Sequence, residues 1–200
     1  MIYEDFKNIS IDPEIGVSQP GKETFLLAKH AQKLGSEKIL DVGTGTGFIP
    51  IFLSKCKLEC TGVDINPKAI ECAKNNSKKN NTENKFIISD LFEKITEKYS
   101  LIIFNPPLGS SKSTSLNKQL EVIKSLIPRD NKTIRNISYR LIEKQRRSLI
   151  SKFLDTSKLY LMKNGKILIH MFNSELDLLD DLSYEILENY ENLNIVKINS

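Results

Sequence analysis

The chain alternates short apolar runs with charged segments, and several of the apolar runs stop abruptly at glycine or at polar residues. Four runs rich in Ile, Leu, Val and Phe have the length and composition of β-strands: residues 39–42, 60–65, 85–90 and 101–104. The run at 101–104 is apolar throughout, which is typical of a central parallel strand covered on both faces. Polar clusters that follow such strands are expected at the carboxyl edge of an open sheet, where α/β folds hold their ligands.

Helices are predicted between and around these strands. Pro50 lies in the first turn of an expected helix at 48–55, where the missing N–H of proline costs nothing. Asn66 followed by Pro67 is a typical helix start, and Gly35 is a typical helix end. In the second half, the pattern predicts a helix, a strand, an acidic helix and a last strand at 143–162, 166–172, 175–190 and 193–198. This alternation predicts an α/β fold with one doubly wound, mostly parallel sheet, strand order 3-2-1-4-5 and an additional C-terminal edge strand.

Length and composition favour a single domain spanning residues 1–200. Apolar residues make up 40% and charged residues 27% of the chain, as in ordinary globular proteins. No run approaches the roughly 18 apolar residues of a membrane span, and residues 1–6 lack the basic and apolar stretches of a signal peptide. The three cysteines have no Cys or His partner at metal-ligand spacing. We therefore expect a cytoplasmic protein with no bound metal and no membrane contact.

The strand at 39–42 opens into a turn with three glycines at alternate positions, Gly43, Gly45 and Gly47. Such glycines permit positive φ and close backbone approach, and the helix that follows offers free N–H groups to a ligand. A dinucleotide fingerprint requires a third glycine where Phe48 stands, so a pyrophosphate is disfavoured. The turn predicts a different nucleotide cradle or, in the plainer alternative, an ordinary tight connection between a strand and a helix.

Two motifs together resemble the class I methyltransferases that use S-adenosylmethionine. The stretch from Asp41 to Gly47 is similar to motif I of that superfamily. The stretch Asn105-Pro106-Pro107-Leu108, directly after an apolar strand, is similar to the motif of its amino-methylating branch. That branch includes adenine-N6 and cytosine-N4 DNA enzymes, several RNA enzymes, and the HemK-type glutamine-N5 methyltransferases of release factors. The resemblance, which is closest to the HemK type, implies a Rossmann-like fold, S-adenosylmethionine as cofactor and an amide or amino nitrogen as methyl acceptor.

The resemblance also implies which residues hold the cofactor. Asp64 follows Gly43 by 21 residues, close to the spacing at which an acid at the end of the second strand binds ribose hydroxyls, although it could merely cap a turn. By resemblance Asp90 accepts from the adenine amino group and the next backbone N–H bonds a ring nitrogen; a plain surface Asp is the alternative. The implied cofactor-binding residues are Asp41, Gly43, Thr44, Gly45, Gly47, Asp64, Ile65, Asp90, Leu91 and Asn105.

The N-terminal part resembles the HemK-type proteins as well. Pro20 is followed by Glu23, Thr24 and an apolar Phe-Leu-Leu, a pattern that in the family lies over the cofactor. The resemblance implies a cofactor lid and helix at 1–35 and a Rossmann-like core at 36–200. A plain capped helix packed on the sheet would give the same pattern.

One departure from the superfamily concerns the end of the sheet. The resemblance covers residues 16–172, and members of the superfamily usually close with an antiparallel seventh strand. With the last strand placed at 193–198, no room remains for a seventh. Either the sheet has six strands or this strand is mis-assigned.

The implied catalytic residues are Asn105, Pro106, Pro107 and Leu108. If the Asn105 side-chain oxygen and the Pro106 carbonyl each accept one N–H, the acceptor nitrogen moves towards a tetrahedral shape and its lone pair points at the methyl group. Catalysis then depends on positioning and on stabilising charge at nitrogen, without a metal. Leu108 stands where the family often has Tyr or Phe, and the missing stacking surface favours a protein amide over RNA or DNA.

Charge is spread unevenly along the chain. Residues 116–158 contain eleven Lys and Arg against four acids, in a chain of net charge +4. This basic segment, which includes Arg146 and Arg147, suits a polyanion such as a nucleic-acid acceptor, and a solvated helical face is the alternative. Two other functions stay open. A small-molecule methyltransferase would not need the basic segment, and a silent subunit that binds S-adenosylmethionine would be expected to lose Asn105 or the glycines.

Overall fold

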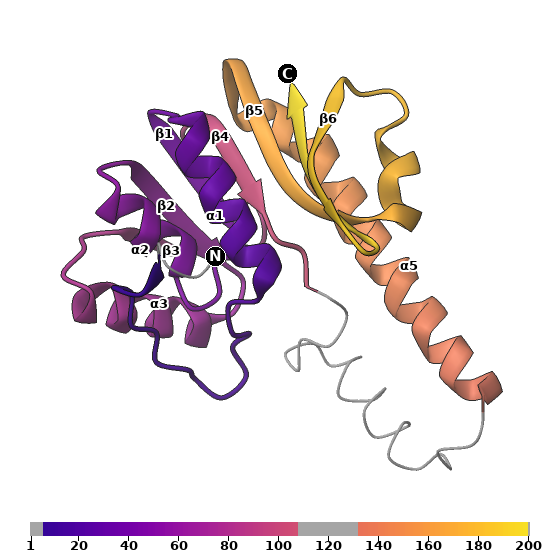
Figure 1. Cartoon of the computed structure of the whole chain (residues 1–200), viewed down its shortest axis with the longest axis horizontal. Coiled ribbons are helices and arrows are strands. Elements are labelled where there is room, and N and C mark those ends of the chain that lie inside the picture. The colour runs from indigo at the N-terminus through magenta and orange to yellow at the C-terminus, as the bar shows by residue number, and fades with distance from the viewer. Residues whose placement is uncertain (1–5, 108–131, 200) are drawn as a thin grey trace.

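The computed structural model describes residues 6–107 and 132–199, and within 132–139 it describes the backbone alone. The described residues form a seven-stranded sheet covered by helices (Figure 1). The strands are β1 (Lys38–Val42), β2 (Glu59–Asp64), β3 (Lys85–Ile88), β4 (Tyr99–Phe104), β5 (Leu161–Phe172), β6 (Tyr184–Tyr190) and β7 (Leu193–Asn199). The helices are α1 (Lys22–Leu34), α2 (Phe48–Lys55), α3 (Pro67–Lys79) and α5 (Lys132–Ser157), with short 3-10 helices η2 (Lys158–Tyr160) and η3 (Asn173–Leu179).

The strand order is β3-β2-β1-β4-β5-β7-β6, which confirms the predicted order 3-2-1-4-5. Neighbouring strands from β3 to β5 pair in parallel, whereas β7 pairs antiparallel with both β5 and β6. The chain winds outward from β1 to β3 and then returns to β4 on the other side of β1. The direction of winding therefore reverses between β1 and β4, which is where open α/β sheets bind their ligands.

The strands bury side chains on both faces of the sheet, because successive residues of a strand point to opposite sides. Leu40 and Ile102 belong to the hydrophobic cluster that includes α5. Ile39 and Leu101, each one position earlier in its strand, belong to the cluster that includes α1 and α2. All four side chains are fully buried, so β1 and β4 are covered on both faces, as the continuous apolar run at 101–104 predicts for a central strand.

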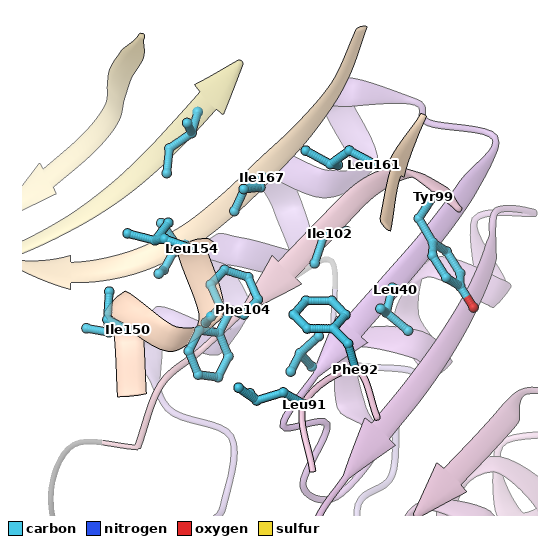
Figure 2. Close-up of a cluster of buried hydrophobic side chains, with 14 of the residues drawn as sticks. Leu40, Leu91, Phe92, Tyr99, Ile102, Phe104, Ile150, Leu154, Leu161 and Ile167 are labelled. Atoms are coloured by element: carbon cyan, nitrogen blue, oxygen red, sulfur yellow. The ribbon is translucent and has the colours of Figure 1, made fainter. Parts of the chain in front are cut away.

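Aliphatic and aromatic side chains pack together between α5 and the sheet (Figure 2). Phe153 of α5 stacks on Phe104 with 4.3 Å between ring centroids and on Phe92 with 5.6 Å. Ile150, one turn before Leu154, lies in the same cluster and is fully buried. Because Phe104 is the last residue of β4, this packing fixes the strand end from which the Asn-Pro-Pro segment continues.

Several predicted helix ends are confirmed. α1 ends at Leu34, and Gly35 follows with a φ of 58°, the left-handed conformation that glycine adopts without cost. α3 begins at Pro67, and the side chain of Asn66 accepts a hydrogen bond from the N–H of Lys68 at 3.0 Å. These ends are specified by local sequence, because the capping residue itself supplies the conformation or the bond.

The predicted acidic helix at 175–190 is wrong. Its first residues lie in η3, and residues 184–190 form β6. The Tyr, Ile and Leu residues of β6 suit a strand, and hydrogen bonding to β7 outweighs the helix propensity of the intervening acids. Lys197 of β7 adds an ion pair with Glu185 of β6. The hairpin of β6 and β7 supplies the seventh strand for which the predicted elements left no room, and the strand predicted at 193–198 lies inside the sheet, between β5 and β6.

The boundary between α5 and β5 also differs from the prediction. α5 ends at Ser157 and β5 begins at Leu161, whereas the sequence predicted a helix to Met162 and a strand from Lys166. Asn164 lies within β5 with a φ of 62°, beside an irregularity in the pairing of β4 with β5. α5 is 26 residues long. Neither it nor any other helix within residues 6–107 and 132–199 is apolar enough to cross a membrane.

The carboxyl ends of β1, β2 and β4 lie level in the sheet. Val42 at the end of β1 pairs with Val63 of β2 on one side and with Phe104 of β4 on the other. The glycine turn, Asp64 and Asn105 therefore emerge from the same edge. The fold thus brings together the two motifs that lie about sixty residues apart in the sequence.

Candidate active site

A cavity of about 450 Å³ lies at the carboxyl edge of the sheet. Its walls come from the glycine turn, the end of β2, the residues after β3 and β4, and the segment 16–20 before α1. The predicted residues that line it are Asp41, Gly43, Thr44, Gly45, Asp64, Ile65, Asp90, Leu91, Asn105, Pro106 and Pro107. Of the other predicted residues, Gly47 is not part of the lining and Leu108 lies outside the described residues.

Gly47 has a packing role that the sequence did not distinguish from ligand binding. Its φ is 80°, and a Cβ added there would lie 2.8 Å from the Cβ of Ala73 in α3 and 3.2 Å from the ring of Phe86. At Gly45, also at positive φ, the nearest atom to an added Cβ is the carbonyl oxygen of Ser18, at 3.7 Å. Gly47 therefore permits close contact between the start of α2 and α3, while Gly45 borders the cavity.

Asp64 joins the end of β2 to the glycine turn. Its Oδ2 accepts the N–H of Gly45 at 3.0 Å, and its Oδ1 accepts the N–H of Asn66 at 2.9 Å. Burial raises the pKa of Asp64, and these backbone N–H groups oppose the shift. Each carboxylate oxygen keeps acceptor capacity, so the pair can still bind hydroxyl groups of a ligand. Ile65 beside it is 63% exposed and adds an apolar surface to the cavity.

Ser89 holds the turn that presents Asp90 and Leu91. Its buried hydroxyl donates to the carbonyl of Leu91 at 3.1 Å and accepts the N–H of Lys94 at 3.1 Å. Leu91 has a φ of 47°, a left-handed conformation that these bonds help to fix. Lys152 of α5 lies 3.4 Å from Oδ2 of Asp90. The carboxylate of Asp90 is therefore placed at the cavity by its own turn and by the helix on that face.

Asn105 is oriented by the N-terminal helix. Its Nδ2 donates to the hydroxyl oxygen of Thr24 at 3.0 Å, and the same hydroxyl oxygen accepts the N–H of Gly21 at 3.2 Å. The Oδ1 of Asn105 is buried and has no hydrogen-bond partner among the described residues. Because the donor end of the amide is bound to Thr24, the acceptor end is left for a ligand.

Unpartnered buried polar atoms gather in this cavity. Across the described residues, these atoms are Oδ2 of Asp41, Oγ1 of Thr44, Oδ1 of Asn105 and both ring nitrogens of His170. The first three belong to residues that line the cavity. Burial raises the pKa of Asp41 to about 7; the side chain of Thr44 beside it opposes the shift, and the nearby charge of Asp64 adds to the increase. Since buried polar groups are normally hydrogen-bonded, the cavity is built for a polar ligand.

Asn76 of α3 and Asn80, which directly follows that helix, hold the chain ahead of the segment 16–20. Asn80 accepts the N–H of Ser10 at 3.0 Å and donates to its carbonyl at 2.7 Å. Asn76, one turn earlier, accepts the N–H of Asp12 at 2.9 Å and donates to its carbonyl at 3.3 Å. The two side-chain amides pair with the backbone as a neighbouring strand would. They place the segment 16–20 along one wall of the cavity.

The sequence did not identify Arg146 and Glu175 as site residues. Both side chains are buried, and Arg146 bonds Glu175 together with the carbonyl oxygens of Pro106 and Pro107. Arg146 follows Pro106 by 40 residues and Glu175 follows Arg146 by 29, so no local pattern marks the contact. One indirect sign was present in the sequence. Pro106 and Pro107 follow an apolar strand and have no N–H groups, so their carbonyl oxygens needed a donor from elsewhere in the chain.

The expected role of Arg146 as a surface contact for a polyanion is wrong, because its charge is buried and paired with Glu175. Arg147 forms an ion pair with Asp177, and Lys152 is paired with Asp90. The side chains of the basic segment before residue 140 lie outside the described residues. Within the described part of the chain, no group of three or more His, Cys, Asp or Glu side chains is placed to hold a metal ion.

Comparison with known proteins places these residues in a family context. A family model described as "Methyltransferase small domain" matches residues 18–129. A protein of Methanocaldococcus jannaschii, provisionally named a protein N5-glutamine methyltransferase, is 39% identical over 114 residues, which are 56% of this chain and 57% of that protein. A Haemophilus influenzae protein named release factor glutamine methyltransferase is 27% identical over 186 residues, which are 81% of this chain and 61% of that protein. The chain thus spans about three fifths of the length of both relatives.

A nucleic-acid enzyme is also similar to part of the chain. The ribosomal RNA small subunit methyltransferase C of Buchnera aphidicola is 44% identical over 85 residues, which are 42% of this chain and 25% of that protein. Among solved structures, a ribosomal protein L11 methylase from Lactobacillus delbrueckii has a TM-score of 0.65 at 16% identity, with 96% of this chain and 84% of that chain covered. The Thermus thermophilus 16S rRNA N2 G1207 methyltransferase, in complex with AdoMet and guanosine, has a TM-score of 0.64 at 15% identity, with 91% of this chain and 44% of that chain covered. At these identities the structures show the shared class I methyltransferase fold alone.

Proposed function

The chain belongs to the methyltransferase small domain family, and on that premise we propose that it transfers a methyl group from S-adenosylmethionine to the side-chain amide nitrogen of a glutamine in a protein. One observation carries the proposal. The amide nitrogen of Asn105 is bonded to Thr24, and its buried oxygen borders the cavity without a partner among the described residues. The relatives named as glutamine methyltransferases support the choice of acceptor.

The cavity has the polar groups that S-adenosylmethionine requires. The two oxygens of Asp64 would hold the ribose hydroxyls, and the unpartnered Asp41 and Thr44 oxygens would hold the charged amino-acid tail. Asp90 and Leu91, placed by the turn after β3, would hold the adenine. When bound, this cofactor supplies an electrophilic methyl group on a positively charged sulfur.

Asn105 and Pro106 would prepare the acceptor nitrogen. An amide nitrogen is a poor nucleophile because its lone pair is delocalised into the carbonyl group. When Oδ1 of Asn105 and the carbonyl oxygen of Pro106 each accept one of its N–H groups, the nitrogen is drawn away from planarity and its lone pair is directed at the methyl group. Pro107 favours an extended Pro106, and neither proline has an N–H that would compete for the acceptors.

We further propose that the chain is a single methyltransferase domain with a cofactor lid at 1–35 and a core at 36–200. Two contacts support a lid. The segment 16–20 lines the cavity, and Thr24 of α1 holds the side chain of Asn105. Because this lid carries Thr24, its closure over the cofactor would also orient the side chain of Asn105, which binds the methyl acceptor.

An exocyclic amino group of RNA is the second candidate acceptor. The similarity to a ribosomal RNA methyltransferase supports it, as does the basic charge of the segment 116–158. Leu108 argues against it, because a base presented outside its helix would lack the aromatic stacking surface that is worth about 1–3 kcal/mol per base. Replacing Leu108 with tyrosine should therefore impair a protein acceptor and improve an RNA acceptor.

Labelling identifies the acceptor class. The protein is incubated with cell extract and radioactively labelled S-adenosylmethionine, and the products are digested separately with protease and with ribonuclease. Loss of the labelled band on protease digestion supports the proposal, and peptide mass spectrometry should then place the methyl group on glutamine. Label that resists protease and disappears with ribonuclease would refute it in favour of RNA, and label found only in small molecules would refute both.

Asn105→Ala tests the mechanism. Turnover should fall by roughly 10²–10³-fold, as when one pre-organised polar contact is removed, while the affinity for S-adenosylmethionine in calorimetry falls much less. Ser100→Ala is a matched control, because Ser100 donates its hydroxyl to the Lys38 carbonyl at the far end of β4. The control should keep normal turnover. Normal turnover in Asn105→Ala would eliminate the proposed role of this side chain.

A further inference from the structure

Every N–H donor of the Arg146 guanidinium meets an acceptor. Nη1 donates to the carbonyl oxygens of Pro106 at 2.5 Å and of Pro107 at 2.8 Å. Nη2 donates to the carbonyl of His170 at 3.1 Å and to Glu175 at 3.2 Å, and Nε donates to Glu175 at 2.7 Å. These five bonds use all five donors of an arginine. The guanidinium therefore has one orientation, and the carbonyl groups that it joins have fixed relative positions.

Glu175 fixes Arg146 in turn. Its side chain is fully buried, and the side chain of Arg146 is 4% exposed. Oε2 of Glu175 also accepts the N–H of Phe172 at 2.8 Å, and the guanidinium lies 4.7 Å from the centre of the Phe172 ring. A buried ion pair is often no more stabilising than well-packed apolar residues of similar volume. The bonding pattern thus points to a role in positioning rather than in stability alone.

The segment after β4 has few other polar groups by which it could be held. Pro106 and Pro107 have no backbone N–H, so their carbonyl groups are the polar groups that remain to them. Arg146 bonds both carbonyls. Its own backbone is anchored, because Ile150, one turn further along α5, is fully buried in the cluster between this helix and the sheet.

We infer that Arg146 is a positioning residue for methyl transfer, which fixes the carbonyl of Pro106 beside the Asn105 oxygen, and that Glu175 holds Arg146 in place. The inference rests on the proposed function, because it assigns the Pro106 carbonyl to the acceptor nitrogen. A carbonyl oxygen has two lone pairs, so the bond from Arg146 leaves one for the acceptor N–H. The carboxylate of Glu175 offsets the guanidinium charge, so Arg146 does not oppose the positive charge that develops on nitrogen.

Three variants of the full chain test the inference. Arg146→Lys keeps a positive charge opposite Glu175 but offers three donors in place of five. Arg146→Met combined with Glu175→Gln removes both charges and keeps an acceptor for the N–H of Phe172. Arg147→Met is the matched control, because Arg147 is the next residue and pairs with Asp177 near the surface.

Both Arg146 variants should lose turnover at saturating acceptor by about 10²-fold, the effect of a small displacement of a reacting group. The KM for the acceptor and the affinity for S-adenosylmethionine should stay close to the wild-type values, and the Arg147→Met control should keep wild-type turnover. A second readout needs no acceptor. In protein labelled with carbonyl-¹³C proline, two of the seven proline signals, those of Pro106 and Pro107, should move in Arg146→Lys and stay in place in the control.

Wild-type turnover in Arg146→Lys would overturn the inference, as would proline signals that do not move. A loss of cofactor affinity as large as the loss of turnover would also overturn it, because it would indicate general damage to the fold. If the double variant is unfolded by circular dichroism, Arg146→Lys decides alone. The turnover of each variant is compared with that of the wild type on the acceptor that the wild-type protein methylates. If that acceptor is RNA, the glutamine proposal is refuted, but the same comparison still tests the role of Arg146.

Discussion

Replacing Gly47 with alanine should weaken the fold more than the same change at Gly45, although both glycines have positive φ. Holding an alanine in the left-handed region costs about 1–2 kcal/mol at either position. At Gly47 the new Cβ would also stand 2.8 Å from the Cβ of Ala73 and 3.0 Å from its Cα, whereas Gly45 has no such collision. Overpacking of this kind costs about 1–3 kcal/mol. Gly47→Ala should therefore lower the free energy of unfolding by about 2–5 kcal/mol, and Gly45→Ala by about 1–2 kcal/mol.

Urea unfolding followed by circular dichroism measures both changes, since the chain has no tryptophan to report by fluorescence. Calorimetry with S-adenosylmethionine should give the opposite ranking, because Gly45 lines the cavity and Gly47 does not. Gly45→Ala should thus lose more affinity and Gly47→Ala more stability. Equal losses of stability in the two variants would refute the argument that contact with Ala73 requires glycine at position 47.

Two further predictions concern pH. Burial raises the pKa of Asp41 to about 7, so this carboxyl group loses its proton between pH 6 and pH 8. The affinity for the positively charged S-adenosylmethionine, measured by calorimetry, should therefore increase about tenfold over that range. Asp41→Asn should remove the increase, and a wild-type pH profile in this variant would contradict the prediction. Burial, aided by the positive charge of Arg146, lowers the pKa of His170 to about 3, so the folded protein keeps this histidine neutral where the unfolded chain protonates it. The contribution of His170 to the free energy of unfolding is fully present above about pH 6.5 and should decrease by about 1.4 kcal/mol per pH unit below it. In urea unfolding, His170→Gln should lack this decrease. If the free energy of unfolding of the variant falls with pH as steeply as that of the wild type, the prediction is wrong.

The parts of the fold that the sequence predicts are those set by short-range physical chemistry. The ends of α1 and α3 follow from Gly35 and Asn66, each of which supplies a conformation or a bond to its own helix end. The continuous apolar run of β4 and the polar residues that follow it predict both a central strand and a site at its end. The position of Asn105 beside the glycine turn then follows from the doubly wound strand order.

The parts that failed depend on partners distant in sequence. Residues 184–190 contain acids that favour a helix, and they form a strand because β7 offers a hydrogen-bonding edge. Arg146 was grouped with its charged neighbours, whereas its position is set by Glu175 and by Pro106. No characteristic spacing or motif marks the pairing of β6 with β7 or the contacts of Arg146, so a single sequence contains no local signal for either.

The position of β7 also matters while the chain is folding. β5 ends at Phe172, and its partner on that side, β7, begins at Leu193, after the whole of β6. Until β7 pairs with β5, the largely apolar stretch 167–172 presents an unpaired strand edge, which is the kind of segment that pairs with other chains. Substitutions that weaken β7 are therefore expected to reduce the yield of folded protein on refolding more than they reduce the stability of the protein once folded.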